Sequence, residues 1–311
     1  MAALKIATGT YGITSALKRG EVQTGLPLEF VEVKAITTDG MRPMVRSLAF
    51  DICEMAFTTY LCARAAGKPL TAIPVFVTRN FHHWAAFINV KSGIKEPKDL
   101  EGRRVGVNRG YTVTTGLWVR GILQHEYGVD LEKITWMPTD EEHVAEFKAP
   151  GNVDHRFVGR SCADLLKSGE LDAAIGDIRV DSPDVRPLIP DARQAGAAYY
   201  RKTGIYPINH SIVVKNAVLE AQPQVAVQLF NAFAASKASY LARLKAGRGL
   251  DKADEAALAL GEIVGGDPFP LGVAANRKAL EALVGFAVEQ HMLPARLAPE
   301  DLFAANTRGL A

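Results

Sequence analysis

Short apolar segments alternate along the chain with stretches in which apolar residues recur every three or four positions. The first pattern predicts buried strands and the second predicts amphipathic helices, because side chains repeat with a period of 2 in a strand and 3.6 in a helix. In the N-terminal part we expect strands at 4–7, 28–33, 52–55 and 72–77, with helices around 14–19, 39–48 and 58–66. This alternation is typical of βαβ units and a mostly parallel sheet.

A second α/β unit is expected to begin near residue 90. Its predicted strands are 104–107, 134–137 and 172–175, with one helix from Thr114 and another at 162–167. A return strand, 209–214, follows Tyr206-Pro207, and the remainder reads as helices at 224–244, 253–263 and 277–289. The alanine-rich helices near the C-terminus fit a homo-oligomer interface and the core of a monomer equally well.

Polar loops follow the predicted N-terminal strands, and ligands of open α/β sheets bind beyond the carboxyl ends of strands. One such loop contains Thr10 and Tyr11, another begins at Glu54, and a third contains Arg79, His82 and His83.

The segment 102–121 predicts a strand, a tight turn at Gly110 and a helix. The first N–H groups of a helix lack internal partners and favour an anion, and Thr112, Thr114 and Thr115 add hydroxyl donors. The segment has neither a Walker lysine nor the GxGxxG spacing, so a carboxylate is a better candidate than a nucleotide. An ordinary threonine-capped helix explains the same residues equally well.

Charge and cysteine content exclude several classes of protein. The 311 residues contain 36 Lys and Arg against 34 Asp and Glu, so we expect neither a nucleic-acid nor a membrane partner. Cys53, Cys62 and Cys162 are too scattered for a zinc site or a disulfide framework, and we expect no metal. These cysteines, with no visible leader or spanning segment, favour the cytoplasm.

Several motifs together resemble one family. The residues GI at 93–94 and PKDLEGRRVGV at 97–107 are similar to a stretch of type II periplasmic-binding-protein folds. Within that superfamily the chain resembles 4,5-dihydroxyphthalate decarboxylases. The segments that carry this resemblance are DICEMAF at 51–57, RNFHH at 79–83, Tyr111-x-x-Thr114-x-x-x-Trp118-x-Arg120-Gly121, EYGV at 126–129, PINH at 207–210 and DPFPLG at 267–272. Where that family has Phe-Arg-His, this chain has Phe81-His82-His83.

The resemblance implies an α/β fold of two lobes, each a mostly parallel sheet flanked by helices, with a ligand cleft between them. Lobe 1 would comprise residues 1–88 and 205–311, and lobe 2 residues 89–204. It also implies a decarboxylase of a phthalate-type aromatic carboxylate. Because the phenol can supply electron density to the ring carbon that is protonated, we expect no cofactor.

Such a reaction needs a proton donor, a partner for the phenol and donors for the carboxylates. We expect His83 to be the donor, with His82 as the alternate, because only one of two neighbours in an extended segment faces a cleft. Glu54 and His210 would serve the phenol. Arg79 and the helix start would hold carboxylates. The substrate-binding residues expected in all are Thr10, Tyr11, Arg79, Tyr111, Thr112, Thr114, Thr115, Asp177 and Asn209.

Purely structural roles are the alternative for three of these residues. Glu54 fits a structural ion pair, His210 a hinge residue bonded to backbone, and Asp177 a helix cap. At the level of the whole chain, the alternative is a binding protein that delivers a small carboxylate or aromatic acid to a transporter, since fold does not determine function. An enzyme of this fold in thiamine-pyrimidine synthesis would call for an iron loop or a lysine-held cofactor, and the sequence has neither.

Overall fold

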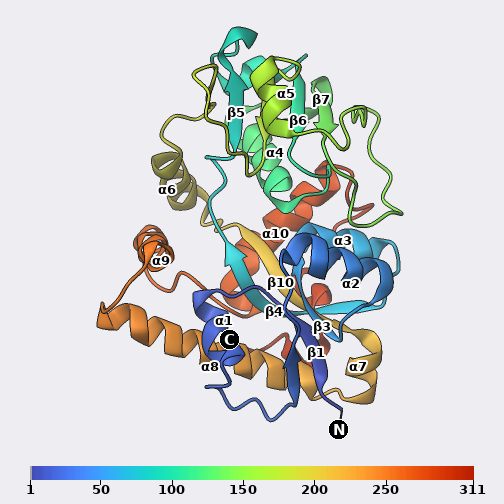
Figure 1. Cartoon of the computed structure of the whole chain (residues 1–311), viewed down its shortest axis with the longest axis vertical. Helices are drawn as coiled ribbons and strands as arrows, with labels where there is room; N and C mark the ends of the chain where they lie inside the picture. Colours follow the sequence, from blue (N-terminus) through green and yellow to red (C-terminus); the bar gives the residue numbers. More distant parts are fainter. Residues whose placement is uncertain (1) are drawn as a thin grey trace.

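The computed structural model describes residues 2–311 and has two lobes, each built on a five-stranded sheet (Figure 1). The first sheet has the order β2-β1-β3-β10-β4 and the second β7-β6-β8-β5-β9. The strands of the first are β1 (Leu4–Ala7), β2 (Leu28–Phe30), β3 (Ile52–Ala56), β4 (Leu70–Arg79) and β10 (Ile208–Lys215). Those of the second are β5 (Ala86–Asn89), β6 (Arg104–Val107), β7 (Thr135–Pro138), β8 (Ala173–Ile175) and β9 (Val185–Pro187).

One strand in each sheet runs against its neighbours. Strand β10 is antiparallel to β3 and β4, and β5 is antiparallel to β8 and β9, whereas β1 with β2 and β3, and β6 with β7 and β8, are parallel. These are the two strands by which the chain enters a sheet from the other lobe. Such a strand starts at the edge where its neighbours end, so it must run in the opposite direction.

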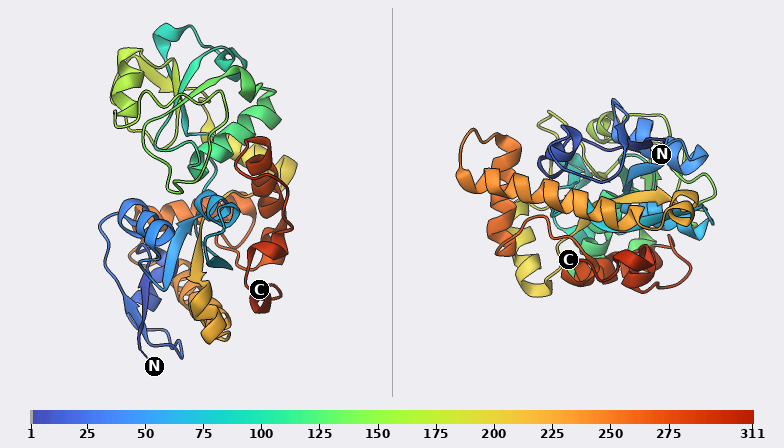
Figure 2. Two further views of the ribbon diagram at one scale, coloured as in Figure 1. Left: turned by 90° about the vertical axis from the view of Figure 1, so that its right-hand side faces the viewer. Right: turned by 90° about the horizontal axis from the view of Figure 1, so that it is seen from below.

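Helices cover both faces of each sheet (Figure 2). The first lobe has α1 (Gly12–Lys18), the π-helix η1 (Ile36–Met41), α2 (Arg42–Ser47), α3 (Phe57–Ala65), α7 (Asn216–Ala221), α8 (Val225–Ala246), α9 (Lys252–Val264), α10 (Val273–Glu289) and the 3-10 turns η5 (Pro299–Leu302) and η6 (Ala305–Thr307). The second has α4 (Thr114–Tyr127), α5 (Cys162–Ser168), α6 (Ala192–Thr203) and the 3-10 turns η2 (Val90–Ser92), η3 (Pro97–Leu100) and η4 (Leu131–Lys133).

The expected two-lobed α/β fold is confirmed, and every predicted strand has a counterpart in the structure. Strands β5 and β9 and helices α6 and α7 were not predicted. Because β5 already belongs to the second sheet, the first crossing between lobes lies at 80–85, earlier than the expected boundary at 88. Helix α6 buries only Gly196 and Tyr199 and its sequence is polar on average, so it has few apolar residues by which to recognise a core-facing helix.

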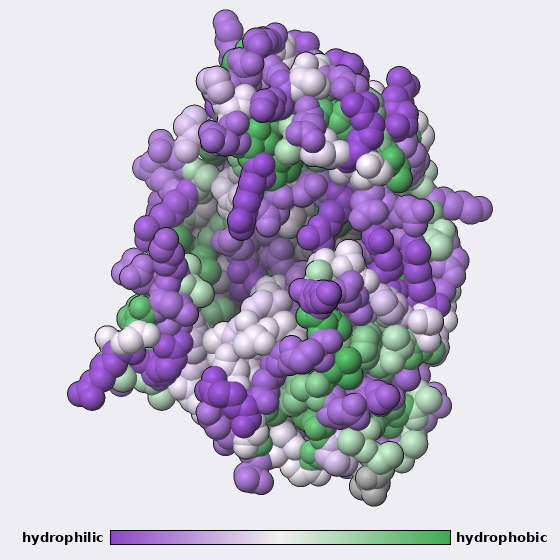
Figure 3. Space-filling model, viewed as in Figure 1, coloured by the Kyte–Doolittle hydropathy of each residue, from purple (hydrophilic) through white to green (hydrophobic). Residues whose placement is uncertain are grey.

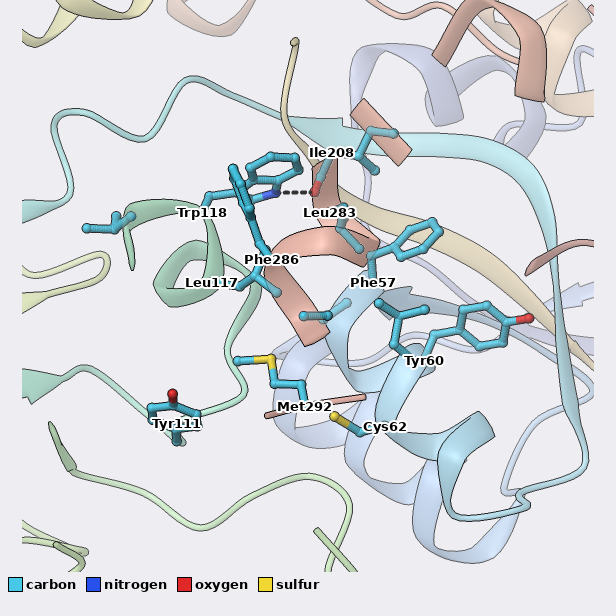
Figure 4. Packing of buried hydrophobic residues seen from close by; sticks show 14 of the residues in the cluster. Phe57, Tyr60, Cys62, Tyr111, Leu117, Trp118, Ile208, Leu283, Phe286 and Met292 are labelled. Carbon is cyan, nitrogen blue, oxygen red and sulfur yellow. Dashed lines mark hydrogen bonds between the residues drawn. The ribbon is translucent and has the colours of Figure 1, made fainter. Parts of the chain in front are cut away.

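The lobes are joined on one side by a buried contact between α4 and α10 (Figure 4). The Phe286 ring meets the Trp118 ring edge-on, with centroids 5.7 Å apart. The Trp118 indole donates to the carbonyl of Ile208, at 2.8 Å. This continuous core runs from one sheet to the other and leaves the cleft on the remaining side.

Candidate active site

A cleft of about 360 Å³ lies between the lobes, and both sheets contribute to its walls. Figure 3 shows the surface hollowed between the lobes, with hydrophilic residues around the hollow. Its lining includes Thr37, Ala56, Thr59, Thr78, Arg79, Asn80, His82, Trp84, Asn209 and His210 from the first lobe and the crossovers, and Asn108–Gly110, Thr112–Thr115, Glu141–His143, Gly176 and Asp177 from the second lobe.

A buried carboxylate and a histidine form a pair in the first lobe. Glu54 lies on the central strand β3, and its side chain has no exposed surface. Its Oε1 is 2.6 Å from Nδ1 of His210 on the neighbouring strand β10. Burial alone would raise the pKa of Glu54, but hydrogen bonds and the charge of His210, with donors from Gly9 and Tyr11, outweigh it and lower the pKa.

This contact orients the imidazole. A carboxylate only accepts, so Nδ1 of His210 carries the proton of that bond and Nε2 is left for another partner. The His210 side chain is 19% exposed and lines the cleft, so the imidazole, and not the carboxylate, can reach a ligand. A register shift in β10 between Ile208 and His210 brings both Asn209 and His210 to the cleft wall.

His82 also lines the cleft and is buried. Its Nε2 is 3.0 Å from Oδ1 of Asn209, an acceptor, so Nε2 donates and Nδ1 keeps its lone pair. No hydrogen-bond partner in the described residues, 2–311, reaches that buried Nδ1. Burial lowers the pKa of His82 to about 4, against the opposing effect of Asn209, so the ring is neutral at pH 7.

His83 lies outside the cleft lining. Its side chain is fully buried, its Nε2 is 3.2 Å from Oε2 of Glu126, and its ring meets Tyr199 edge-on. Burial lowers the pKa of His83, and Glu126 counteracts this. The structure therefore places the expected proton donor within the crossover segment, packed against Glu126 and Tyr199 and outside the cleft lining.

Arg79 ends β4 at the cleft, but its guanidinium turns into the protein. It donates to the Tyr206 carbonyl at 2.6 Å and to Oδ1 of Asn276 at 2.8 Å, and it lies 3.9 Å over the Tyr206 ring. Burial lowers the pKa of Arg79 to about 10. Both terminal nitrogens have protein partners, so the bidentate carboxylate contact expected from the sequence is not available in this conformation.

The expected anion site at the start of α4 already holds an acid. The carboxylate of Glu142 accepts from the N–H groups of Tyr111 and Thr112, at 2.5 and 3.1 Å, and from the Thr112 hydroxyl. Thr114 lies beside it and shares a 2.8 Å hydroxyl contact with Thr58 across the lobes. Thr115 lines the cleft.

Of the other residues expected to bind substrate, two line the cleft and two do not. Asp177 and Asn209 line the cleft, whereas Thr10 and Tyr11 do not; Thr10 accepts from Lys18, and the Tyr11 hydroxyl donates to Glu54 at 2.7 Å. The sequence interpretation missed Trp84, Arg109 and Glu142 as lining residues. One of the three, Glu142, had a signal in the sequence, because it belongs to the acidic run Asp140-Glu141-Glu142 shortly after a strand.

Within residues 2–311, no three His, Cys, Asp or Glu side chains are grouped as a metal site would require. Across the same residues, no helix is both long and apolar enough to cross a bilayer.

Comparison with known proteins identifies the family. The model of the "NMT1/THI5 like" family matches residues 23–242. The 4,5-dihydroxyphthalate decarboxylase of Comamonas testosteroni is 34% identical over 259 residues, which cover 78% of this chain and 76% of that protein. The chain belongs to this family. The enzyme of the same name from Pseudomonas putida is 32% identical over 215 residues, 64% of this chain and 81% of its own length.

A solved structure supports the fold class independently. The periplasmic aliphatic sulphonate binding protein SsuA of Escherichia coli superposes with a TM-score of 0.55 at 14% identity, covering 99% of both chains. This decarboxylase family thus shares its two-lobed architecture with binding proteins, and the fold alone does not separate the two functions.

Proposed function

We propose that the chain is a decarboxylase of a dihydroxyphthalate-type benzene carboxylic acid. Two relatives named 4,5-dihydroxyphthalate decarboxylase, at 34% and 32% identity, support the reaction class. The observation that carries the proposal is the buried Glu54 carboxylate 2.6 Å from His210, whose ring opens to the cleft. An acid that stabilises an imidazolium facing a ligand is an arrangement for proton transfer.

In the proposed reaction His210 protonates the ring carbon that bears the leaving carboxylate. Nε2 gives up its proton as a phenol oxygen para to that carbon pushes electron density into the ring, forming a dienone-like intermediate. The bond to the carboxylate then breaks, its electron pair restores the aromatic ring, and carbon dioxide leaves. One proton is consumed in each turnover, and solvent returns it to His210.

His82 is proposed as the acceptor for the phenol proton. Its Nδ1 has no partner in the described residues, and its pKa of about 4 keeps the ring neutral at pH 7, so it can act as an acceptor once the substrate displaces the side chains that cover this buried atom. The proton that it takes returns to the phenol when the ring becomes aromatic again. The phenol thus supplies the electrons, and the reaction as drawn uses no cofactor. The roles differ from those expected from the sequence, because His210, and not His83, lines the cleft.

The cleft also suits a binding protein for an aromatic acid. Proton transfer distinguishes the two functions, since binding alone needs no imidazole held by a buried carboxylate. A cytoplasmic location is also part of the proposal, and it is supported by three cysteines that are buried and form no disulfide.

The test is incubation of the purified protein with 4,5-dihydroxyphthalate and a panel of hydroxylated phthalates and benzoates, with carbon dioxide as readout. In deuterated water the product should carry one deuteron at the carbon that lost its carboxyl group. Binding of these acids without carbon dioxide release would support the binding protein instead.

A further inference from the structure

A charged segment of the second lobe, residues 139–148, spans the mouth of the cleft, and we call it the acidic strap. Four of its side chains contact the first lobe. These contacts are Asp140 with Arg42 at 2.8 Å, Glu141 with Arg46 at 3.3 Å, His143 with Thr59 at 3.2 Å and Glu146 with Lys68 at 2.5 Å. Glu142 differs from these neighbours because it turns to the start of α4 in its own lobe.

Both carboxylate oxygens of Glu142 are bound as those of a ligand would be. Oε1 accepts from the Tyr111 N–H, and Oε2 accepts from the Thr112 N–H and hydroxyl. Gly110 allows this approach, because a Cβ there would lie only 2.7 to 2.9 Å from the Glu142 carboxylate atoms. We call these donors, with Gly110, the carboxylate cradle.

A buried cation reinforces the cradle from behind. Arg120 on α4 is fully buried, and its guanidinium bonds to neutral groups, the Gln290 side chain and the Tyr111 carbonyl, both at 2.7 Å. One of its nitrogens, Nη1, has no hydrogen-bond partner in the described part of the chain. The Tyr111 carbonyl belongs to the same peptide unit as the Thr112 N–H, so Arg120 polarises a donor that holds Glu142.

We propose that Glu142 occupies the subsite for a substrate carboxylate and that a ligand must displace it to bind there. The proposal rests on the decarboxylase function proposed above. A second carboxylate cannot use the same three donors while Glu142 holds them, and the two charges would repel each other. The apparent affinity for an aromatic acid is therefore reduced by the fraction of molecules in which Glu142 fills the cradle.

Acids with one and with two carboxylates both compete with Glu142, but they differ in what they gain elsewhere in the cleft. For an acid with one carboxylate, the binding free energy gained in the cradle is little more than the free energy lost when Glu142 leaves it. An ortho-dicarboxylate has a second charged group for the rest of the cleft, where Arg109 is exposed on the wall. A phthalate-type acid, which makes the additional contact, can therefore displace Glu142 at a lower concentration than a benzoate-type acid can.

The test is calorimetric titration with phthalate and with benzoate. Neither has the hydroxyl group that the proposed reaction needs, so binding is measured without turnover. We expect Glu142→Ala to tighten phthalate binding by about tenfold or more, because the cradle is then empty. Benzoate affinity should rise by a similar factor, because both acids compete with Glu142 for the same cradle.

Glu146→Ala is the matched control. It removes the same charge from the same strap and breaks the contact with Lys68, but Glu146 touches neither the cradle nor the cleft lining. Its phthalate affinity should stay within about twofold of the parent.

Equal or weaker phthalate binding by Glu142→Ala, relative to Glu146→Ala, would overturn the proposal and make Glu142 a structural cap of α4. Glu142→Gln keeps the shape of the side chain and carries the test if the alanine variant does not fold. Its neutral amide should hold the cradle less strongly and give a smaller gain in affinity. If Glu142→Ala binds phthalate more tightly but the parent protein releases no carbon dioxide from any acid of the panel, the decarboxylase function is rejected. The displacement of Glu142 by a carboxylate is then still supported.

Discussion

Glu54 and His210 have different exposures, and that difference assigns their roles at the scale of single residues. The carboxylate accepts hydrogen bonds from Thr8, Gly9, Tyr11 and His210 and has no contact with solvent. It can stabilise a charge on the imidazole, but it cannot itself touch a ligand in the cleft. On the first-lobe side of the cleft, the histidines in the lining are His210 and His82, and the partly exposed His210 ring is the one that the buried carboxylate serves.

Replacing His210 by Asn removes the titrating group while keeping a polar side chain. We expect turnover to fall by roughly 10²–10⁴-fold, the usual contribution of a general acid, with a much smaller change in KM. Steady-state release of carbon dioxide measures both parameters. His83→Asn is the comparison, because His83 is bonded to Glu126 outside the cleft. Near-normal turnover in His210→Asn together with a large loss in His83→Asn would reverse the assignment.

The sequence indicated that Glu54 needs a partner, because a carboxylate within an apolar strand is costly to bury alone, and the structure provides His210 as that partner. The sequence could not choose between His82 and His83. Both are buried, and the choice depends on the path of the crossover segment between the sheets. Arg79 was expected to bind substrate, but its contacts with Tyr206 and Asn276 depend on segments far away in the sequence.

At the scale of elements, the contact between α4 and α10 fixes how the lobes meet. Gly121 on α4 allows this close packing, because a Cβ there would lie 2.1 Å from a ring atom of Phe286. We expect Gly121→Ala to destabilise the fold by about 1–3 kcal/mol through overpacking, despite the better helix propensity of alanine. Urea unfolding gives the free energy directly.

A smaller side chain at position 286 should relieve the clash with a Cβ at position 121. The double variant Gly121→Ala/Phe286→Leu is expected to lose less stability than the sum of its two single changes. Additive losses would show that the ring is not the obstacle.

Elements with a strong apolar repeat were predictable, and elements fixed by their surroundings were not. The alternation of strand and helix gave β6 at the bounds found in the structure and α4 from its first residue, Thr114. Strand β9 is three residues long and polar in part, and it is a strand only because β5 lies beside it. No local pattern could reveal a segment whose partner lies about 100 residues earlier in the chain.

At the scale of the whole molecule, two histidines tie stability to pH. Burial lowers the pKa of His82 and of His143 to about 4. Between about pH 6.5 and pH 4 the unfolded chain therefore binds protons that the folded protein does not, and stability falls as pH falls. For the fully buried His82 the loss approaches about 3 kcal/mol.

Urea unfolding at pH 7, 5.5 and 4.5 measures this dependence. His82→Asn should flatten it, since the neutral amide does not titrate. Glu54 acts in a different window: its lowered pKa gives stability that is present above its ordinary pKa and lost at lower pH, as the folded carboxylate is protonated. Parallel curves for the parent and His82→Asn would exclude His82 as a source of the slope.

The place of β10 between β3 and β4 has a consequence for the order in which the molecule is made. On the ribosome, β3 and β4 emerge more than 120 residues before the strand that separates them, since β4 ends at Arg79 and β10 begins at Ile208. The second sheet is complete once residue 187 has emerged, so its lobe can fold while the first still has a gap between β3 and β4. During that interval the apolar edges of β3 and β4 are open to unwanted pairing, and the nascent chain is at its most prone to aggregation there.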